Sequence, residues 1–440
     1  MKKGMNGTMI RKLKDSWLSI ILAIVVIFSI VLSFFIWVAP YNNATHNRGD
    51  AGNVKQFNLQ SIGDIYLPTE VVRVKSDGSA EMLYGQRDNL VLTSRNIINK
   101  WHFGNPTRVS HDDQQHYLDM LRMPKTMVLS YYYPVPTAVF NQVYSQDLNT
   151  KRMGRVTRIV LPLNNRNTAY LLNDSNFAVY RVHLSKNQNQ KLNSLLASTG
   201  GGQVNVDRRV IDHRIYSFYM RGITLPSFAY QVETQKIDNV THNLMNDTNG
   251  NNISTSNKGN ITVYQNGTNK RLTYNHETKT ISYDNYLGKN NNLSTTQLYN
   301  TLYQRLTKTG VVMDSMRFDQ FNEKQQAITY VPYVEGFPVY SPDGYGTVKI
   351  SENYEGVERY RYSLYSLQTP VPTNAEKVKL PSTAAVVNEL RQSGKYKEIS
   401  GIRVGYNWDS QSTDEKTVTL KPTYFVDYHG TWINYQELLK

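Results

Sequence analysis

Apolar and polar positions divide the chain into one long apolar run and a mostly polar remainder. Residues 17–39 form an uninterrupted stretch of 23 residues without a charged side chain, WLSIILAIVVIFSIVLSFFIWVA. As a helix, this run would extend about 35 Å, enough to cross a hydrocarbon core of about 30 Å. It is longer than the apolar core of a cleaved signal peptide and ends in bulky residues, so we predict a retained transmembrane helix.

The charges on either side of this run predict its orientation. The first 16 residues contain five Lys or Arg, whereas the next positive residue after the run is Arg48. Because positive residues stay on the cytoplasmic side, we expect 1–16 to be a cytoplasmic basic tail and the bulk of the chain to lie outside the cell membrane. The polar stretch 40–65 is predicted to be a juxtamembrane spacer.

Within the predicted helix, one stripe of side chains combines small and large residues. Six positions alternate in spacings of four and three and therefore share a face: Ser19, Ala23, Val26, Ile30, Ser33 and Trp37. Small residues let two helix backbones approach closely in lipid, which would make this stripe a contact for a partner helix. Small residues are also common in membrane helices that pair with nothing, and the sequence leaves both interpretations open.

Beyond residue 65 the pattern changes to short alternating segments separated by turns. In 66–200, the alternation before and after Asp77-Gly78 predicts a hairpin. Helices are expected near 89–101, 138–146 and 189–197, with further strands between them. Gly200–Gly202 follow a helix and therefore indicate a stop and a linker, since a phosphate-binding loop would precede one.

The remaining sequence contains two similar units, which predict a weak tandem duplication. Each unit has a helix that begins at Ser and ends at Gly, followed by two strands of which the second carries Pro: Ser294, Gly310 and Pro332, then Ser382, Gly394 and Pro422. The stretch 208–220, RRVIDHRIYSFYM, is expected to be one strand of the first of these units. The predicted fold is α+β, with three extracytoplasmic domains of antiparallel sheet and packed helices at 66–200, 201–341 and 342–440.

Charge and cysteine content narrow the possible functions. The net charge is +14, of which +10 lies beyond the basic tail. A basic exterior favours anionic partners, and Arg152, Arg155 and Arg158 are a candidate patch for anionic cell-wall polymers. A solvated strand face is the favoured alternative for these arginines. The absence of cysteine from the sequence excludes disulfides, zinc–thiolate sites and thiol nucleophiles.

Sequence motifs for catalysis or metal binding are weak. In SHDDQQH, His111 and His116 are five residues apart rather than four and lack the adjacent Glu of helical zinc hydrolases, so Ser110 and Asp113 are interpreted as a helix capping box. The chain has no G-x-S-x-G and no Ser-x-x-Lys, although a triad of distant residues stays open. Tyr131–Tyr133 could form an aromatic ligand platform, but a Tyr-rich strand is favoured. We therefore predict no catalytic, cofactor-binding or metal-binding residue, and no enzyme.

Three C-terminal motifs resemble a known family. They are VPYVEGFPVYSPDGYGTVKI at 331–350, RLTYNHETKTISYDN at 271–285 and LKPTYFVDYHGTWINY at 420–435. Together with the basic tail, the single anchor and the cysteine-free exterior, they are similar to the YycH (WalH) family of low-GC Gram-positive bacteria. The most specific part is YVEGFPV followed by G-x-V-x-I.

This resemblance implies a non-enzymatic accessory regulator of the WalK/WalR two-component system. Proteins of the family associate with the sensor histidine kinase WalK and with the single-pass membrane protein YycI, through membrane helices and external domains. The resemblance thereby implies control of cell-wall metabolism. It implies no catalytic residues. No basic run in the sequence is dense enough for a nucleic-acid arm, so we expect no nucleic-acid partner.

Overall fold

The computed structural model describes most of the chain beyond residue 60. The described residues are Val26 together with 61–85, 89–197, 200–212, 214–245, 253–288, 293–372, 376–408 and 416–440. The chain divides into two compact units, Met1–Asn58 and Leu59–Lys440, and in the first only Val26 is described, as part of a helix. No helix within the described residues is long and apolar enough to span a membrane. The predicted span 17–39 lies, Val26 apart, outside these residues.

A ten-stranded antiparallel sheet forms the first half of Leu59–Lys440. Its strand order is β10-β9-β2-β1-β5-β6-β7-β8-β3, with β4 also paired to β8. The strands are β1 (Glu70–Val74), β2 (Ala80–Tyr84), β3 (His102–Phe103), β4 (Thr107–Ser110), β5 (Thr126–Pro136), β6 (Arg155–Pro162), β7 (Thr168–Asn173), β8 (Ala178–Ser185), β9 (Gly202–Ile211) and β10 (Arg214–Tyr219). The predicted hairpin at Asp77-Gly78 is confirmed as β1–β2.

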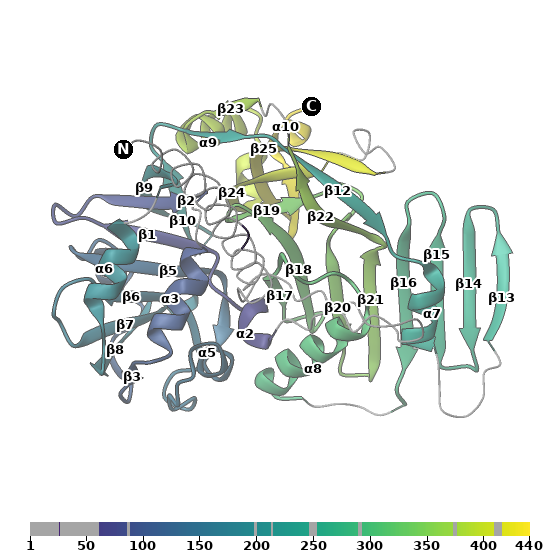
Figure 1. Cartoon of the computed structure of the whole chain (residues 1–440), viewed down its shortest axis with the longest axis horizontal. Coiled ribbons are helices and arrows are strands. Elements are labelled where there is room, and N and C mark those ends of the chain that lie inside the picture. Colours follow the sequence, from purple (N-terminus) through teal and green to yellow (C-terminus); the bar gives the residue numbers. More distant parts are fainter. Residues whose placement is uncertain are drawn as a thin grey trace, which may run out of the picture. The chain divides into compact units, whose positions relative to one another are not determined.

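Helices cover both faces of this sheet. One face carries α2 (Ile62–Ile65), α3 (Leu90–Ile98), α5 (Thr137–Tyr144) and α6 (Asn189–Ala197) (Figure 1). The other face packs against α4 (Gln114–Leu121) through the buried side chains of Tyr117 and Leu121. The helices expected near 89–101, 138–146 and 189–197 are confirmed by α3, α5 and α6.

A fourteen-stranded sheet forms the second half. Its order is β13-β14-β15-β16-β21-β20-β18-β19-β24-β25-β12-β22, with β17 on β18 and β26 on β25. The strands are β12 (Phe228–Thr234), β13 (Ile253–Lys258), β14 (Ile261–Asn266), β15 (Lys270–Asn275), β16 (Thr280–Tyr286), β17 (Met316–Asn322), β18 (Ala327–Val334), β19 (Phe337–Tyr340), β20 (Val348–Glu352), β21 (Val357–Ser363), β22 (Tyr365–Val371), β24 (Ile399–Trp408), β25 (Thr417–Tyr428) and β26 (Thr431–Asn434). Among these strands β19 and β24 pair in parallel and the other pairs are antiparallel.

The helices of the second half are α7 (Ile237–Met245), α8 (Thr295–Lys308), α9 (Thr383–Gln392) and α10 (Tyr435–Leu438). Short-range signals in the sequence account for the start of α8. The predicted capping box of α8 is confirmed, since Ser294 and Gln297 each bond the other's backbone N–H. Its apolar side chains Leu298, Leu302 and Leu306 are buried against the sheet. A separate pair of strands, β11 (Ile223–Pro226) and β23 (Lys377–Leu380), lies near α9 (Figure 1).

The two units with similar sequence patterns form the elements expected of them. In both, a glycine with positive φ follows the helix, Gly310 after α8 and Gly394 after α9. Two antiparallel strands follow, in which Pro332 lies opposite Met316 and Pro422 lies opposite Tyr406. The α+β class with extensive antiparallel sheets is therefore confirmed. The tandem duplication and the three domain ranges stay predictions.

Two local predictions were wrong. The stretch 208–220 is a hairpin of β9 and β10, with Asp212 in the left-handed region at φ 46°, and β9 pairs with β2 of the first sheet. The alternation of this stretch is interrupted at Asp212, where the chain turns. In SHDDQQH, Asp113 rather than Ser110 begins the helix, because its carboxylate accepts from the His116 backbone N–H at 2.9 Å, while Ser110 ends β4.

Tyr66, at the end of α2, joins the two sheets. Its side chain is fully buried, and its ring lies 5.5 Å from that of Tyr299 on α8 and 5.3 Å from that of Phe318 on β17. The Tyr66 hydroxyl is 2.9 Å from the hydroxyl of Tyr330 on β18. Because α2 also contacts α5 of the first half, this short helix packs on both halves. It lies within the range 40–65 that was predicted to be a spacer, so the folded body begins earlier than expected, and Ile65 is buried.

Candidate functional site

The predicted transmembrane stripe cannot be compared with the structure. Of its six residues, Ser19, Ala23, Ile30, Ser33 and Trp37 lie outside the described residues. Val26 is helical and about half exposed, at 49%. The stripe therefore stays a prediction.

The predicted arginine patch is wrong, because its three members do not share a surface. Arg152 is exposed in a turn, whereas Arg155 begins β6 and forms an ion pair with Glu323. Arg158, on the same strand, is only 3% exposed and lies on the opposite face. A spacing of three residues reverses direction in a strand, whose side chains alternate from face to face. Because Arg158 is buried, it belongs neither to a patch for anionic polymers nor to a solvated strand face.

Arg158 instead anchors a buried network in the first sheet. Its guanidinium donates to Asp174 at 2.8 and 3.0 Å, to Ser130 Oγ at 2.9 Å and to the Ile215 carbonyl at 2.6 Å. Tyr117 of α4 donates to the same Asp174. The buried cation is thus paired with a carboxylate and makes four hydrogen bonds, which offset the cost of burying its charge.

A cavity of about 70 Å³ lies next to this network, between the first sheet and β18, β19 and β24 of the second. Glu70 on β1 enters it and accepts from Arg208 Nη1 at 2.6 Å and from Ser217 Oγ at 2.7 Å. Burial alone would raise the pKa of Glu70, but Arg208 and Arg158 outweigh it and hold that pKa below its usual value. Glu70 is therefore a stable carboxylate and a poor general base.

A second buried pair lies on the other side of the same cavity. Arg403 on β24 donates to Asp319 on β17, which is completely buried. Burial raises the pKa of Asp319 to about 6, although Arg403 opposes the shift. Tyr340 supports the carboxylate from β19, with its hydroxyl 3.0 and 3.2 Å from the two oxygens.

Three aromatic rings surround the Arg403 guanidinium. Its Cζ lies 3.9 Å from the ring centre of Tyr132, 4.2 Å from that of Trp432 and 4.9 Å from that of Tyr340. Tyr132 comes from β5 of the first sheet, so the cation–π contacts cross between the halves. The tyrosine stretch 131–133 is thus a strand, as favoured from the sequence, and one of its rings binds the chain's own arginine.

The ion pairs Glu70–Arg208 and Asp319–Arg403 each lie within one sheet, and the contact of Arg403 with the Tyr132 ring links the two sheets. Each carboxylate at the cavity already has a partner, and no group of His, Asp and Glu in the described part of the chain could hold a metal ion. A serine faces Glu70, but that carboxylate's lowered pKa makes it unable to activate a nucleophile efficiently. The cluster is suited to fixing the relative position of the two sheets.

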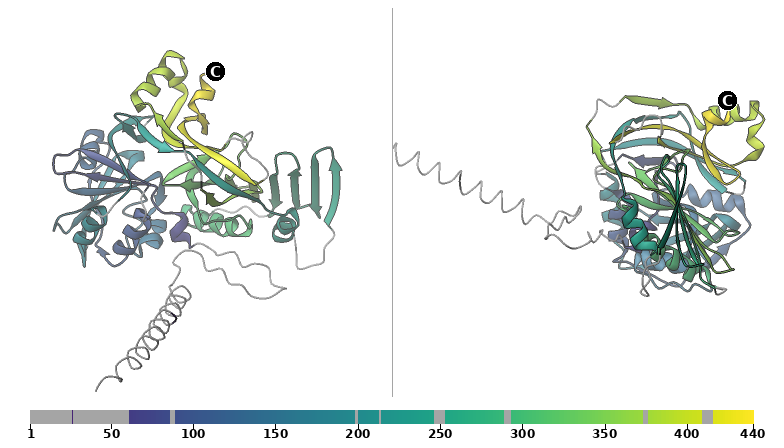
Figure 2. Two further views of the ribbon diagram at one scale, coloured as in Figure 1. Left: turned by 45° about the horizontal axis from the view of Figure 1, so that its top comes forward. Right: turned by 90° about the vertical axis from the view of Figure 1, so that its right-hand side faces the viewer.

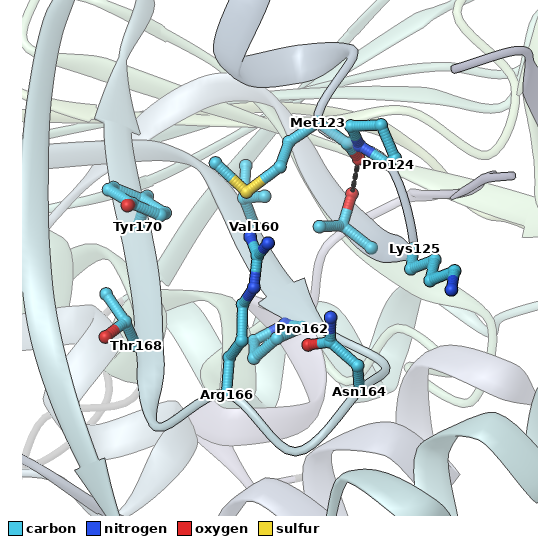
Figure 3. Close-up of a pocket in the computed structure, with 10 residues that line it drawn as sticks. Met123, Pro124, Lys125, Val160, Pro162, Asn164, Arg166, Thr168 and Tyr170 are labelled. Carbon is cyan, nitrogen blue, oxygen red and sulfur yellow. Dashed lines mark hydrogen bonds between the residues drawn. The ribbon is translucent and has the colours of Figure 1, made fainter. Parts of the chain in front are cut away.

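A second hollow, on the first sheet, is much smaller. It encloses about 20 Å³ beside β5, β6 and β7, and the Arg166 side chain extends into it toward Met123 and Val160 (Figure 3). A single hydrogen bond, from Thr126 Oγ1 to the Met123 carbonyl at 2.7 Å, crosses its edge (Figure 3). Ligand pockets measure several hundred Å³, so this hollow is too small for a substrate.

Sequence reasoning missed Glu70, Arg208, Asp319 and Arg403. Each lies on a strand, and a charged residue at an inward position of a strand was the available signal, although Arg208 stands between two other charged residues. For Asp319 even this signal is obscured, since a register shift between Phe318 and Gln320 turns two successive side chains into the core.

Comparison with known proteins gives matches along nearly the whole chain. The family model described as the YycH protein N-terminal domain matches residues 15–199, and the YycH protein C-terminal domain matches 220–438. Among solved structures, the crystal structure of YycH from Bacillus subtilis matches with a TM-score of 0.68 and 14% identity, covering 86% of this chain and 98% of the solved one. At that identity the likeness concerns the fold. No curated protein matches the chain.

Proposed function

The chain belongs to the YycH family, and from this membership we propose that it is a non-enzymatic, membrane-anchored regulator of a two-component system of the WalK/WalR type. The observation that carries the proposal is the match of both family domains, in order, over 15–199 and 220–438. The regulated process is cell-wall metabolism. The partners are a WalK-like sensor histidine kinase and a YycI-like single-pass membrane protein.

In this proposal residues 17–39 are the membrane anchor. Their 23 uncharged residues and the five Lys or Arg before them support a single span with the N-terminus in the cytoplasm. The body from 66 to 440 then lies outside the cell. Of the three expected domain ranges, the sheet of 66–200 also takes in β9 and β10 up to residue 219, and strands of 201–341 and 342–440 share the second sheet. The last two ranges derive from a tandem duplication, which the similar order of helix, glycine and paired strands supports.

The stripe of Ser19, Ala23, Val26, Ile30, Ser33 and Trp37 contacts the partner helices. A helix that packs better against one signalling arrangement of a kinase shifts the kinase toward that arrangement. Small residues favour such packing because they let the two backbones approach.

Co-purification of the full-length chain with the kinase tests the stripe. Replacing Ser19, Ala23 and Ser33 by Leu should reduce the recovered kinase several-fold. Ser29→Leu, which enlarges a small residue outside the stripe, is the matched control and should have no effect. Equal recovery with the triple variant and with wild type would remove the stripe from the proposal.

A further inference from the structure

One face of the second sheet gathers positive charge. The strands β15, β16, β21 and β20 lie next to one another in the sheet (Figure 1, Figure 2). The face opposite α7 and α8 carries Arg271 on β15, Arg359 and Arg361 on β21, and Lys349 on β20, together with one carboxylate, Asp284 on β16. We call these five residues the basic face.

The pairing of the strands brings these side chains together. Arg271 lies opposite Asp284, and Asp284 lies opposite Arg359. In the next row Arg361 lies directly opposite Lys349. Four cations and one carboxylate thus share two neighbouring rows, which leaves a net charge of +3 on these five residues.

The placement of Arg361 opposite Lys349 is unfavourable for the isolated chain. Like charges directly across two strands destabilise a sheet. Burial, assisted by the charge of Arg361, lowers the pKa of Lys349. Lys349 Nζ donates to a neutral acceptor, Gln325 Oε1 at 2.7 Å, so this bond brings no negative charge to offset the repulsion, and Asp284 is shared by Arg359 and Arg361. A bound anionic group would compensate it.

The two arginines of β21 are held in place and remain accessible. Arg359 and Arg361 donate to the same Asp284 at 3.1 and 3.2 Å. Arg361 also donates to the carbonyls of Tyr283 and Tyr360. Even so, their side chains are 50% and 44% exposed. Guanidinium groups fixed in this way can bind a carboxylate through two parallel hydrogen bonds at little cost in entropy.

Two exposed tyrosines adjoin the basic face at one end. Tyr286 ends β16 on the same face as Asp284 and is 50% exposed, and Tyr354 in the β20–β21 turn is 54% exposed. The backbone N–H of Leu287 donates to the Gly356 carbonyl, which brings these two chain segments together. Exposed Tyr beside Arg is the composition of protein–protein interfaces, in which these residues contribute most of the binding energy.

We propose that the basic face, with Tyr286 and Tyr354 beside it, is a docking surface for a protein partner that presents Asp and Glu side chains on an extended or flat segment. The charge of the face selects the carboxylates, and the tyrosines favour a polypeptide over a phosphate polymer. The proposal concerns the external body, and it does not rest on the membrane anchor or on the regulatory function.

Titration of the full-length chain in lipid nanodiscs tests this surface. The two probes are a fluorescent poly-L-glutamate of about 20 residues and a polyphosphate of matched charge. The test variant is R359Q/R361Q, and the control is K377Q/K379Q, which removes two exposed charges from β23. Thermal unfolding of both variants establishes that the fold is kept, and K349Q provides a second, milder change to the same face.

We expect poly-L-glutamate to bind at least tenfold more weakly to R359Q/R361Q than to wild type, and the control to bind as wild type does. Replacing Tyr286 and Tyr354 by Ala should weaken poly-L-glutamate binding and leave polyphosphate binding unchanged. Equal weakening by R359Q/R361Q and by the control would overturn the docking surface. Tighter binding of polyphosphate, lost in R359Q/R361Q, would overturn the protein partner.

Discussion

Replacing Arg403 by Met tests how much the buried pair with Asp319, and the contact of Arg403 with Tyr132 of the first sheet, stabilise the fold. The change removes the ion pair and the contacts with three rings at 3.9, 4.2 and 4.9 Å, and it leaves the Asp319 carboxylate without a cation. Removing one partner of a buried pair costs about 3–5 kcal/mol, because the remaining charge is stranded. We expect R403M to lower the free energy of unfolding by this amount at pH 8.

The double variant R403M/D319N separates the stranded charge from the lost packing. Asn at 319 is neutral and can still accept from the Tyr340 hydroxyl. The double variant should therefore be about 1–3 kcal/mol more stable than R403M alone. Urea unfolding of a 59–440 fragment, followed by tryptophan fluorescence, measures both values, since Trp432 lies against Arg403.

The dependence on pH gives an independent check. In the wild type the pKa of Asp319 is raised to about 6 from its ordinary 3.8. The folded state therefore binds this proton more tightly, and roughly 3 kcal/mol of stability present at low pH is lost as pH rises from 3.8 to 6. Without Arg403 the pKa rises further, so R403M should continue to lose stability above pH 6.

Three results would refute this reasoning. One is a difference between wild type and R403M that stays constant from pH 5 to pH 8. Another is a double variant no more stable than R403M, which would mean that lost packing, rather than a stranded charge, causes the destabilisation. A loss below about 1 kcal/mol for R403M would place the pair among weak surface bridges.

Three further predictions address other parts of the body, each by thermal or urea unfolding. R158M should lose about 3–5 kcal/mol of unfolding free energy, because it leaves the buried Asp174 carboxylate without a cation. R152A should change that free energy by less than about 0.5 kcal/mol, because Arg152 is exposed. Similar losses for both variants would contradict the buried network. Tyr66→Ala should lower the free energy of unfolding by about 3–5 kcal/mol, because it removes the buried ring. Tyr66→Phe should lower it by only about 1 kcal/mol, since Phe keeps the ring and loses only the hydrogen bond to the Tyr330 hydroxyl. Equal losses for the two variants would be inconsistent with this packing. Ser294→Ala should cost about 1 kcal/mol by removing the cap of α8, and Ser294→Asp should restore most of it.

The sequence predicted best what short-range interactions determine. The start of α8 follows from Ser294 and Gln297, three residues apart, and its end follows from Gly310, whose φ of 71° favours glycine. The hairpin at Asp77-Gly78 was likewise predictable from two residues. In these places the residues that define the element also make its hydrogen bonds.

Features made by distant segments were not predictable in the same way. Asp319 and Arg403 are 84 residues apart and meet only because β17 and β24 lie in one folded sheet. The bulge beside Phe318 is a further obstacle, since it changes which side chains face inward. The prediction for Arg158 failed for a different reason. Arg155 and Arg158 are close in sequence and were therefore assigned to one surface, but the strand places them on opposite faces.

The position of Tyr66 affects how a pull on the chain would be borne. Residue 61 directly precedes α2, and this short helix with its tyrosine is packed on α5 and on β17. A pull at residue 61 would therefore load the packing of Tyr66 on both halves before it reached β1. Four aromatic rings, those of Tyr66, Tyr299, Phe318 and Tyr330, hold the first helix of the body in place.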